Sequence, residues 1–309
     1  MKVLVLGAGA VGLCVAAKLS RVCEVHAVSR KKSADAITSG GFALTGIWGE
    51  ETYRFSVSEN VPKGDRYNYI FITSKSQDTE TICRQYAHVI QNTETVSLQN
   101  GIGNEEIISR YTNRVIGGMI ITGFEWRGDA GVYVSVEAGP MKLGRFPSGM
   151  DAGAERLVEL VRTAGIWVEG SLAITSDLWS KTLYNCALNP LGAVMGVPYG
   201  KLTHPASWRI IEQIVKEGFG VVTAEGVTLP WKNADEYLAY LKTVQLPATA
   251  LHHSSMLQDI VKGRMTEISF INGAVVEKGR THGIPTPFNS CIVDLIRFRE
   301  SLGRKGDIT

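Results

Sequence analysis

The stretch KVLVLGAGAVG, residues 2–12, decides the fold of the first half of the chain. Its opening run, Lys2–Leu6, is short and rich in β-branched and aliphatic residues, which indicates a buried strand. Residues Ala10–Leu19 have the composition of a helix, and Glu24–Val28 form a second short apolar run. The order strand, helix, strand is the first unit of an open α/β sheet.

The turn between the first strand and the helix has the GxGxxG pattern of a dinucleotide-binding fingerprint. In this pattern Gly7 permits the tight turn, Gly9 lets the backbone approach a pyrophosphate, and Gly12 lets the helix pack closely on the sheet. The phosphates would face the amino terminus of the helix. The predicted cofactor-binding residues of this turn are Gly7, Ala8, Gly9, Ala10, Val11 and Gly12.

The residues at the end of the second strand indicate which of the two nicotinamide cofactors is bound. An acidic residue there would bind the ribose hydroxyls of NAD and repel a 2'-phosphate. The chain instead has Ser29 and Arg30, followed by Lys31 and Lys32. One hydroxyl and three cations favour NADP, with Ser29 and Arg30 as its ligands, although a solvated basic turn would have the same composition.

Short apolar runs continue to about residue 165 and then give way to helical spacing. The further predicted strands are Tyr69–Thr73, Glu94–Leu98, Arg114–Thr122 and Gly165–Val168, and the helices between them are Thr79–Ile90 and Ala154–Thr163. The later predicted helices are Asp177–Met195, Pro205–Glu225, Ala234–Leu241, Met256–Lys262, Thr266–Arg280 and Pro287–Leu302. We therefore predict a Rossmann-type α/β domain over residues 1–169 and an all-α substrate domain over residues 170–309.

Composition restricts the class of partner. The chain has 309 residues, 44% of them hydrophobic and 20% charged, and a net charge of +2, which does not suit a nucleic-acid-binding protein. No apolar run is long enough for a membrane helix, and five scattered cysteines without a CxxC motif fit a reducing compartment. We expect a cytoplasmic protein with a small-molecule substrate, and a helical second domain offers surfaces on which a homodimer could form.

A polar strip is predicted on the first helix of the second domain. Lys181, Asn185 and Asn189 are spaced four residues apart, so their side chains project from nearly one face. Their neighbours are apolar, namely Leu183, Ala187, Leu188 and Leu191. Buried polar groups need partners, which could be an oxygen-rich substrate or the neighbouring helices.

Several other segments, taken together with the glycine turn and the polar strip, resemble the ketopantoate reductase family from end to end. These segments are SKSQ at residues 74–77, NGIG at 100–103, SSMLQD at 254–259, TEI at 266–268 and ING at 271–273. A match in this many parts is far more specific than any one motif alone. The resemblance implies NADPH-dependent reduction of 2-dehydropantoate to pantoate by hydride transfer to the 2-oxo carbon.

The resemblance also implies roles for individual residues. Lys181 would be the general acid, and Glu267 would help to position it and contact the substrate hydroxyl. The substrate-binding residues would be Asn100, Asn185, Asn189 and Ser255, and the further cofactor-binding residues would be Lys75, Gln77 and Asn100. No metal is expected, since a lysine acid makes one unnecessary. Taken alone, Lys181 could be part of a surface ion pair, and Glu267 could be a favourable charge in the first turn of a helix.

Three other functions are compatible with the sequence. Ser74, His252 and His253 depart from the family pattern and could indicate a different small 2-oxo acid. A dehydrogenase of a sugar acid or an opine would share the two-domain plan, but the polar strip disfavours it. A non-catalytic NADP-binding regulator is a third alternative, which the presence of Lys181 and Glu267 disfavours.

Overall fold

The structure, a computed structural model, describes residues 1–302 and divides into two compact units. The first unit comprises residues 1–99 and 104–175. The second comprises residues 100–103 and the chain from residue 176 onward. The short loop 100–103 therefore belongs to the helical unit, although in the sequence it follows a strand of the first unit.

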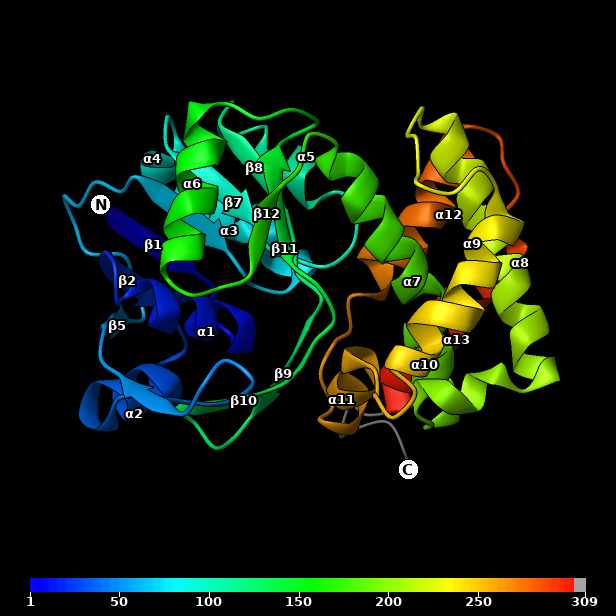
Figure 1. Ribbon diagram of the computed structural model, residues 1–309, viewed down its shortest axis with the longest axis horizontal. Helices are drawn as coiled ribbons and strands as arrows, with labels where there is room; N and C mark the ends of the chain where they lie inside the picture. Colours follow the sequence, from blue (N-terminus) through cyan, green and yellow to red (C-terminus); the bar gives the residue numbers. More distant parts are fainter. Residues whose placement is uncertain (303–309) are drawn as a thin grey trace. The chain divides into compact units, whose positions relative to one another are not determined.

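The first unit is built on an eight-stranded sheet in the order β12-β11-β8-β7-β6-β1-β2-β5 (Figure 1). Its strands are β1 (Lys2–Leu6), β2 (Glu24–Val28), β5 (Ser56–Ser58), β6 (Tyr69–Ile72), β7 (Glu94–Ser97), β8 (Val115–Met119), β11 (Met141–Arg145) and β12 (Val168–Gly170). All neighbouring pairs are parallel except β8 with β11. Chain order reverses between β1 and β6, and in such sheets ligands bind beyond the carboxyl ends of the strands at this point.

Both faces of the sheet are buried, as the unbroken apolar run of β1 requires. Val3 and Val5 contribute to a core that includes residues of α1 (Ala10–Leu19) and α6 (Ala152–Thr163). Leu4 and Leu6 contribute to a second core on the opposite face. That face is covered by α3 (Thr79–Gln85), α4 (Ala87–Ile90) and α5 (Asn104–Ile108). The remaining helices of this unit are α2 (Lys31–Gly40) and η1 (Ser76–Asp78).

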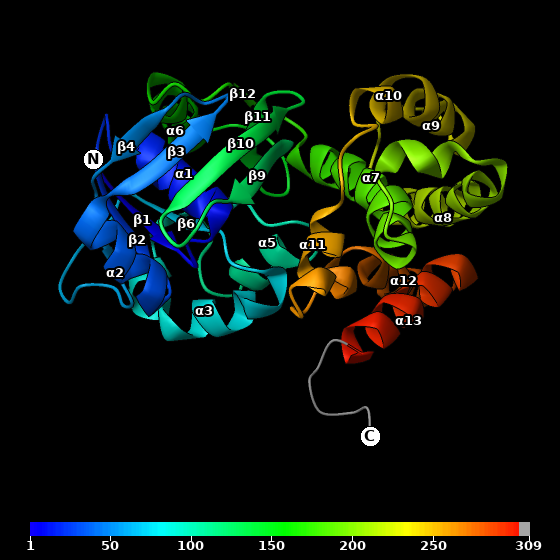
Figure 2. The same cartoon turned by 90° about the horizontal axis from the view of Figure 1, so that it is seen from below.

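A second sheet, of order β4-β3-β10-β9, also belongs to the first unit and was not predicted from the sequence (Figure 2). Its strands are β3 (Phe42–Gly46), β4 (Glu51–Tyr53), β9 (Thr122–Trp126) and β10 (Gly131–Glu137). Strands β3 and β9 contact α1, so that helix is covered on the side away from the main sheet. This explains why α1 is almost wholly apolar.

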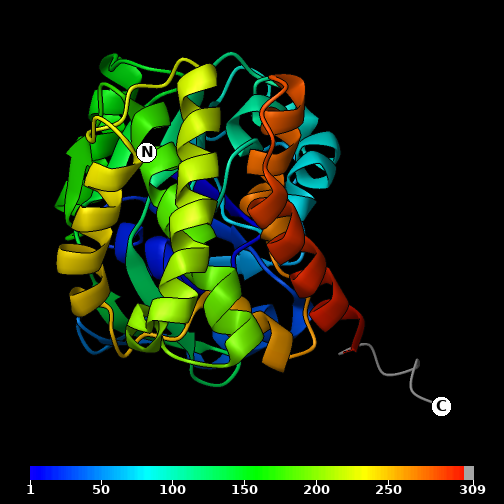
Figure 3. The same cartoon turned by 90° about the vertical axis from the view of Figure 1, so that its right-hand side faces the viewer.

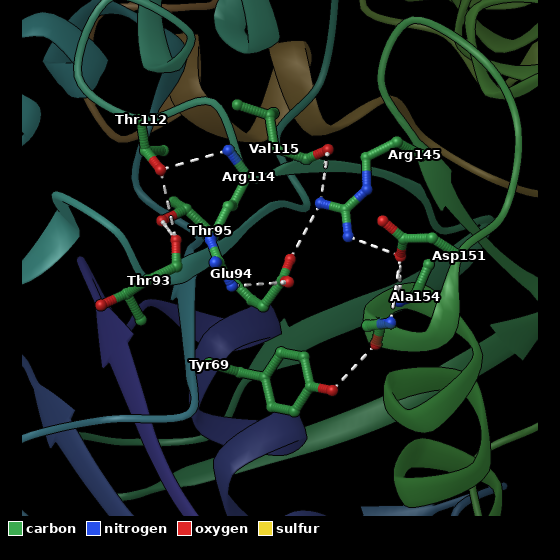
Figure 4. Close-up of polar contacts among 11 residues, drawn as sticks. Tyr69, Thr93, Glu94, Thr95, Thr112, Arg114, Val115, Arg145, Asp151 and Ala154 are labelled. Atoms are coloured by element: carbon green, nitrogen blue, oxygen red, sulfur yellow. Dashed lines mark hydrogen bonds and ion pairs between the residues drawn. The ribbon is translucent and has the colours of Figure 1, made fainter.

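An ion-pair network joins β7, β11 and the start of α6 (Figure 4). The guanidinium of Arg145 donates to Glu94 at 2.8 Å and to Asp151 at 2.7 Å. Asp151 is the N-cap of α6 and accepts hydrogen bonds from the backbone nitrogens of Gly153 and Ala154. The network thus satisfies free donors of the helix while it fixes the helix against the sheet.

The second unit is helical in the part that the structure describes. Its elements are α7 (Ile174–Met195), η2 (Tyr199–Thr203), α8 (Pro205–Ala224), α9 (Ala234–Tyr240), η3 (Leu241–Gln245), α10 (Leu246–Ala248), α11 (Ser255–Val261), η4 (Ile268–Phe270), α12 (Asn272–Thr281) and α13 (Pro287–Leu302). Helix α8 packs between α9 on one side and α12 and α13 on the other (Figure 3). The predicted α/β domain followed by an all-α domain is confirmed.

Several predicted elements are wrong in their extent. The predicted strand Gly165–Val168 shares only Val168 with β12 (Val168–Gly170), and the predicted helix Thr79–Ile90 is divided into α3 and α4. The run Arg114–Thr122 ends as β8 at Met119, and Thr122 begins β9 of the other sheet. The predicted helix Thr266–Arg280 is a short turn, η4, followed by α12 from Asn272. The backbone carbonyl of Phe270 accepts a hydrogen bond from the backbone nitrogen of Ile102 at 2.8 Å, which interrupts the helical ladder at that point.

Candidate active site

The glycine turn has the geometry that a dinucleotide requires. Gly7 has a φ of +67°, and a Cβ on it would lie 2.4 Å from the Cβ of Ser74. A Cβ on Gly12 would lie 2.1 Å from Oγ1 of Thr73. A Cβ on Gly9 would meet only the Gly7 carbonyl oxygen, at 4.0 Å. The turn is therefore close-packed at Gly7 and Gly12 and open at Gly9, where α1 begins without a side-chain cap.

The basic segment after β2 contains one cation that differs from its neighbours. Lys31 is paired with Asp35 at 3.0 Å and Lys32 with Asp129 at 3.0 Å. Arg30 is the N-cap of α2 and forms no ion pair with any of residues 1–302. Ser29 donates its hydroxyl proton to the carbonyl of Ala8 at 2.8 Å, which ties the end of β2 to the glycine turn.

Lys75 and Gln77 lie directly after β6, the strand next to β1. Lys75 is half-buried as the N-cap of η1, and Gln77 is exposed. Sequence reasoning missed Gln99, which is buried and donates to Oγ1 of Thr79 at 2.7 Å and to the carbonyl of Ser74 at 3.1 Å. These bonds hold the segment that contains Lys75 in the first unit.

In the second unit, the structure brings together three residues that lie far apart in the sequence. The Nζ of Lys181 donates to Oδ1 of Asn100 at 2.7 Å. The Nδ2 of Asn100 donates to Oε2 of Glu267 at 3.0 Å. The carboxamide of Asn100 thus joins the ammonium to the carboxylate: its oxygen accepts from Lys181, and its nitrogen donates to Glu267.

The loop that carries Asn100 is fixed by close backbone packing. Gly101 has a φ of +86°, and a Cβ on it would lie 2.2 Å from the carbonyl oxygen of Phe270. The backbone nitrogen of Ile102 donates to that same oxygen. Only glycine fits at position 101, which explains the NG pair in the sequence.

Burial determines the electrostatics of the lysine. Removal of its ammonium from water lowers the pKa of Lys181 to about 8, and the negative charge of Glu267 opposes this shift. Glu267 itself is 6% exposed and stands at the N-cap of η4 rather than within a helix. A buried ammonium held by a carboxamide, with its pKa near neutrality, can donate a proton as well as stabilise negative charge.

The other predicted residues of this unit differ in their surroundings. Asn185 and Asn189 are buried on α7, as are the apolar residues Leu183, Ala187, Leu188 and Leu191 of the same helix. The Oδ1 of Asn189 accepts a hydrogen bond from the hydroxyl of Tyr199, a residue that sequence reasoning missed. Ser255 is exposed at the start of α11. Its neighbour Ser254 caps that helix and donates to the backbone carbonyl of Asn189 at 3.1 Å.

Among residues 1–302, no three His, Cys, Asp or Glu side chains are grouped so that they could hold a metal ion. No helix in this range has the length and apolar character needed to cross a membrane.

Comparison with known proteins places these features in a family. Residues 3–148 match the family model described as ketopantoate reductase PanE/ApbA, and residues 173–300 match the model for its C-terminal part. The 2-dehydropantoate 2-reductase of Aquifex aeolicus is 34% identical over 316 residues, with 99% of each chain covered. That of Archaeoglobus fulgidus is 32% identical over 302 residues, covering 97% of this chain and 98% of the relative.

Two solved structures are similar to this chain over almost its whole length. The PanE/ApbA family ketopantoate reductase from Ralstonia eutropha superposes with a TM-score of 0.89 at 27% identity, covering 98% of this chain and all of the other. D-mandelate dehydrogenase, solved with NADH and anilino(oxo)acetate, gives the same TM-score at 25% identity, covering 98% and 99% of the two chains. This chain belongs to the ketopantoate reductase family of oxidoreductases.

Proposed function

We propose that the protein reduces 2-dehydropantoate to pantoate with NADPH and that Lys181 is the general acid. The observation that carries the proposal is the hydrogen-bonded series from Lys181 through Asn100 to Glu267. We choose 2-dehydropantoate as the substrate because the similar proteins from Archaeoglobus fulgidus and Aquifex aeolicus are 2-dehydropantoate 2-reductases. The series contains the ammonium of Lys181, which can donate the proton that the ketone oxygen must receive.

The chemistry assigned to the chain is proton delivery. Bound NADPH would supply the hydride that adds to the 2-oxo carbon. As negative charge develops on the oxygen, the ammonium of Lys181 stabilises it and transfers a proton to it, which leaves a hydroxyl on the product and a neutral amine on the enzyme. The amine then regains a proton from solvent. Because Asn100 accepts from Lys181 and donates to Glu267, it holds the ammonium in one orientation.

Substrate recognition would use the donors on and beside α7. We assign Asn185, Asn189 and Ser255 to the oxygens of the 2-oxo acid, together with Asn100. Asn185 is 6% exposed, and its carboxamide makes no hydrogen bond with another residue in the described part of the chain. A buried carboxamide in that condition suits a site where a ligand supplies the missing partner.

The residues present fit NADP rather than NAD. The glycine turn leaves space beside Gly9 for a pyrophosphate, and Ser29 and Arg30 would hold the 2'-phosphate. We assign Lys75, Gln77 and Asn100 to the nicotinamide half of the cofactor. The two lysines after Arg30 already have carboxylate partners, so Arg30 is the residue on which the preference would mainly depend.

Another 2-oxo acid is the second candidate for the substrate. The likeness to D-mandelate dehydrogenase, whose solved complex contains NADH and the 2-oxo acid derivative anilino(oxo)acetate, favours including aromatic 2-oxo acids in any test. The same likeness requires that NADH be compared directly with NADPH.

The experiment is a steady-state assay of the full chain. Purified protein is mixed with NADPH or NADH and with 2-dehydropantoate, straight-chain, branched and aromatic 2-oxo acids, and the loss of nicotinamide absorbance is followed. The highest kcat/KM should belong to 2-dehydropantoate with NADPH. A higher value for another 2-oxo acid would reassign the substrate. Binding of NADPH without turnover of any member of the panel would favour a regulatory protein.

A further inference from the structure

The hydroxyl of Tyr199 is buried against the carboxamide of Asn189. Tyr199 is 2% exposed and Asn189 is 4% exposed. The phenolic hydroxyl donates to Oδ1 of Asn189 and has no other hydrogen-bond partner among the described residues. If the amide were turned over, its nitrogen would face the phenol, and the phenolic proton would be left without an acceptor. Tyr199 therefore selects one of the two orientations of the amide.

The tyrosine is itself held firmly. Its ring packs edge-on against those of Tyr184, at a centroid distance of 5.9 Å, and His252, at 5.4 Å. Its backbone nitrogen donates to the carbonyl of His252 at 3.0 Å. The asparagine is fixed at its backbone by Ser254, whose hydroxyl donates to the Asn189 carbonyl. Tyr199 cannot move without losing these contacts, and the backbone from which the Asn189 side chain extends is fixed as well.

The consequence for Asn189 is that its amide nitrogen faces away from Tyr199 and is the end of the carboxamide left without a partner among the described residues. None of residues 1–302 accepts a hydrogen bond from Nδ2 of Asn189. Eight residues earlier on the same helix stands Lys181, whose ammonium is also a donor only. A ligand group that meets Nδ2 of Asn189 must therefore be a hydrogen-bond acceptor, such as a carboxylate or carbonyl oxygen.

We propose that Tyr199 is a positioning residue that locks Asn189 as a hydrogen-bond donor, so that the site selects ligands with an acceptor oxygen at this point, as a 2-oxo acid anion has. The proposal rests on the proposed function, because it takes Asn189 to be in the substrate site. Tyr199 itself need not touch the substrate; it acts through the orientation of the amide.

Three single variants separate this role from a structural one. Tyr199→Phe removes only the hydroxyl that orients the amide. Asn189→Asp is nearly isosteric and keeps an acceptor for Tyr199, but it replaces the donor with a carboxylate. Tyr184→Phe is the matched control, because it removes a hydroxyl from the same aromatic cluster whose partner is Thr249, at 2.9 Å.

Binding is measured by calorimetry with 2-dehydropantoate and with oxamate on the complex of the protein with NADP+, which cannot reduce them. Tyr199→Phe should weaken binding of both by about tenfold, and Asn189→Asp by more, while Tyr184→Phe stays within about twofold of the wild type. In turnover assays Tyr199→Phe should raise KM for the 2-oxo acid, with kcat and the KM of NADPH changed by less than about threefold.

A double-mutant cycle tests whether Tyr199 acts through Asn189. In the Asn189→Ala background, Tyr199→Phe should have no further effect on binding, whereas independent contributions would add. Equal effects of Tyr199→Phe and Tyr184→Phe, an additive cycle, or full affinity in Asn189→Asp would overturn the proposal. So would a wild-type protein that binds neither ligand. Wild-type binding without turnover would instead refute the reductase assignment and leave this inference in place.

Discussion

The side-chain amide of Asn272 donates a hydrogen bond to the backbone carbonyl of Cys186 at 3.2 Å. That carbonyl lies four residues before Pro190, which stands inside α7 and has no N–H to offer it. The asparagine of the ING segment thus supplies the donor that the proline removes. Its Nδ2 also donates to Oδ1 of Asn289 at 2.9 Å, which ties α7, α12 and α13 together.

Asn272→Ala should therefore lower the free energy of unfolding by about 2–4 kcal/mol, because it leaves two buried acceptors without their donor. Urea denaturation of the wild type and the variant measures the loss. Pro190→Ala restores a backbone donor for Cys186, so in that background Asn272→Ala should be less harmful. An equal cost in both backgrounds would show that the bond to Cys186 contributes little.

The parts of the fold that the sequence predicted are those with a local cause. The strands Lys2–Leu6 and Glu24–Val28 and the helices Ala10–Leu19 and Pro287–Leu302 have the predicted bounds, since apolar runs, glycines and a proline mark their ends. The sheet of β3, β4, β9 and β10 could not be predicted in this way. Strand β10 pairs with β3 nearly ninety residues earlier, and β9 shows no fully buried residue.

The residues of the candidate site likewise fall into two groups: those that local spacing predicts and those that no local pattern indicates. The spacing of Lys181, Asn185 and Asn189 shows by itself that they share a helix face, and the helix is as predicted there. Nothing local indicates that Asn100 lies between Lys181 and Glu267, because 81 and 167 residues separate the bonded pairs. Asn100 and Glu267 were predicted only from the family resemblance. Tyr199 was missed because its partner lies across a turn, where no periodicity applies.

A second prediction concerns Glu105 at the start of α5. This carboxyl is 1% exposed, and its Oε1 has no hydrogen-bond partner in the described part of the chain. Burial, and then the charge of Glu106, raise the pKa of Glu105 from 4.5 to about 7. The folded protein then binds more protons than the unfolded chain between those two values, so this group makes stability fall as pH rises through that window.

Glu105→Gln removes the buried charge and should raise the unfolding free energy by about 2–3 kcal/mol at pH 8, and by much less at pH 4.5. Thermal or urea unfolding across this range gives the difference curve. The control is Glu106→Gln, a change at the exposed neighbour that removes only the smaller of the two causes and should give a much weaker pH dependence. A Glu105→Gln curve without pH dependence would mean that the carboxyl is ionised or hydrated in the fold.

A third prediction concerns the cofactor. Arg30→Ala should raise KM for NADPH by about 10- to 100-fold and leave KM for NADH nearly unchanged, since only the former has a 2'-phosphate. Lys31→Ala is the matched control, because Lys31 is adjacent but paired with Asp35. Parallel kinetics with both cofactors measure the effect. A similar loss with NADH would place Arg30 elsewhere than at the phosphate, and a larger loss in Lys31→Ala would transfer the role to the lysine.

The last prediction concerns the acid itself. With Lys181 as proton donor, kcat/KM should fall as pH rises above about 8, where the ammonium loses its proton. Lys181→Ala should lower kcat by at least about 100-fold and remove that limb of the profile. Because the charge of Glu267 holds the pKa of Lys181 up, Glu267→Gln should move the limb to lower pH.

The pH dependence of kcat/KM in wild type, Glu267→Gln and a control, Glu277→Gln, separates this effect from a general loss of negative charge. Glu277 is exposed on α12 and pairs with Arg280, so its removal should leave the limb where it is. A limb that stays in place in Glu267→Gln, or that survives in Lys181→Ala, would assign the titrating group to another residue. If the high-pH limb moves in Glu267→Gln but not in Glu277→Gln, the measured pKa belongs to Lys181, which Asn100 joins to Glu267.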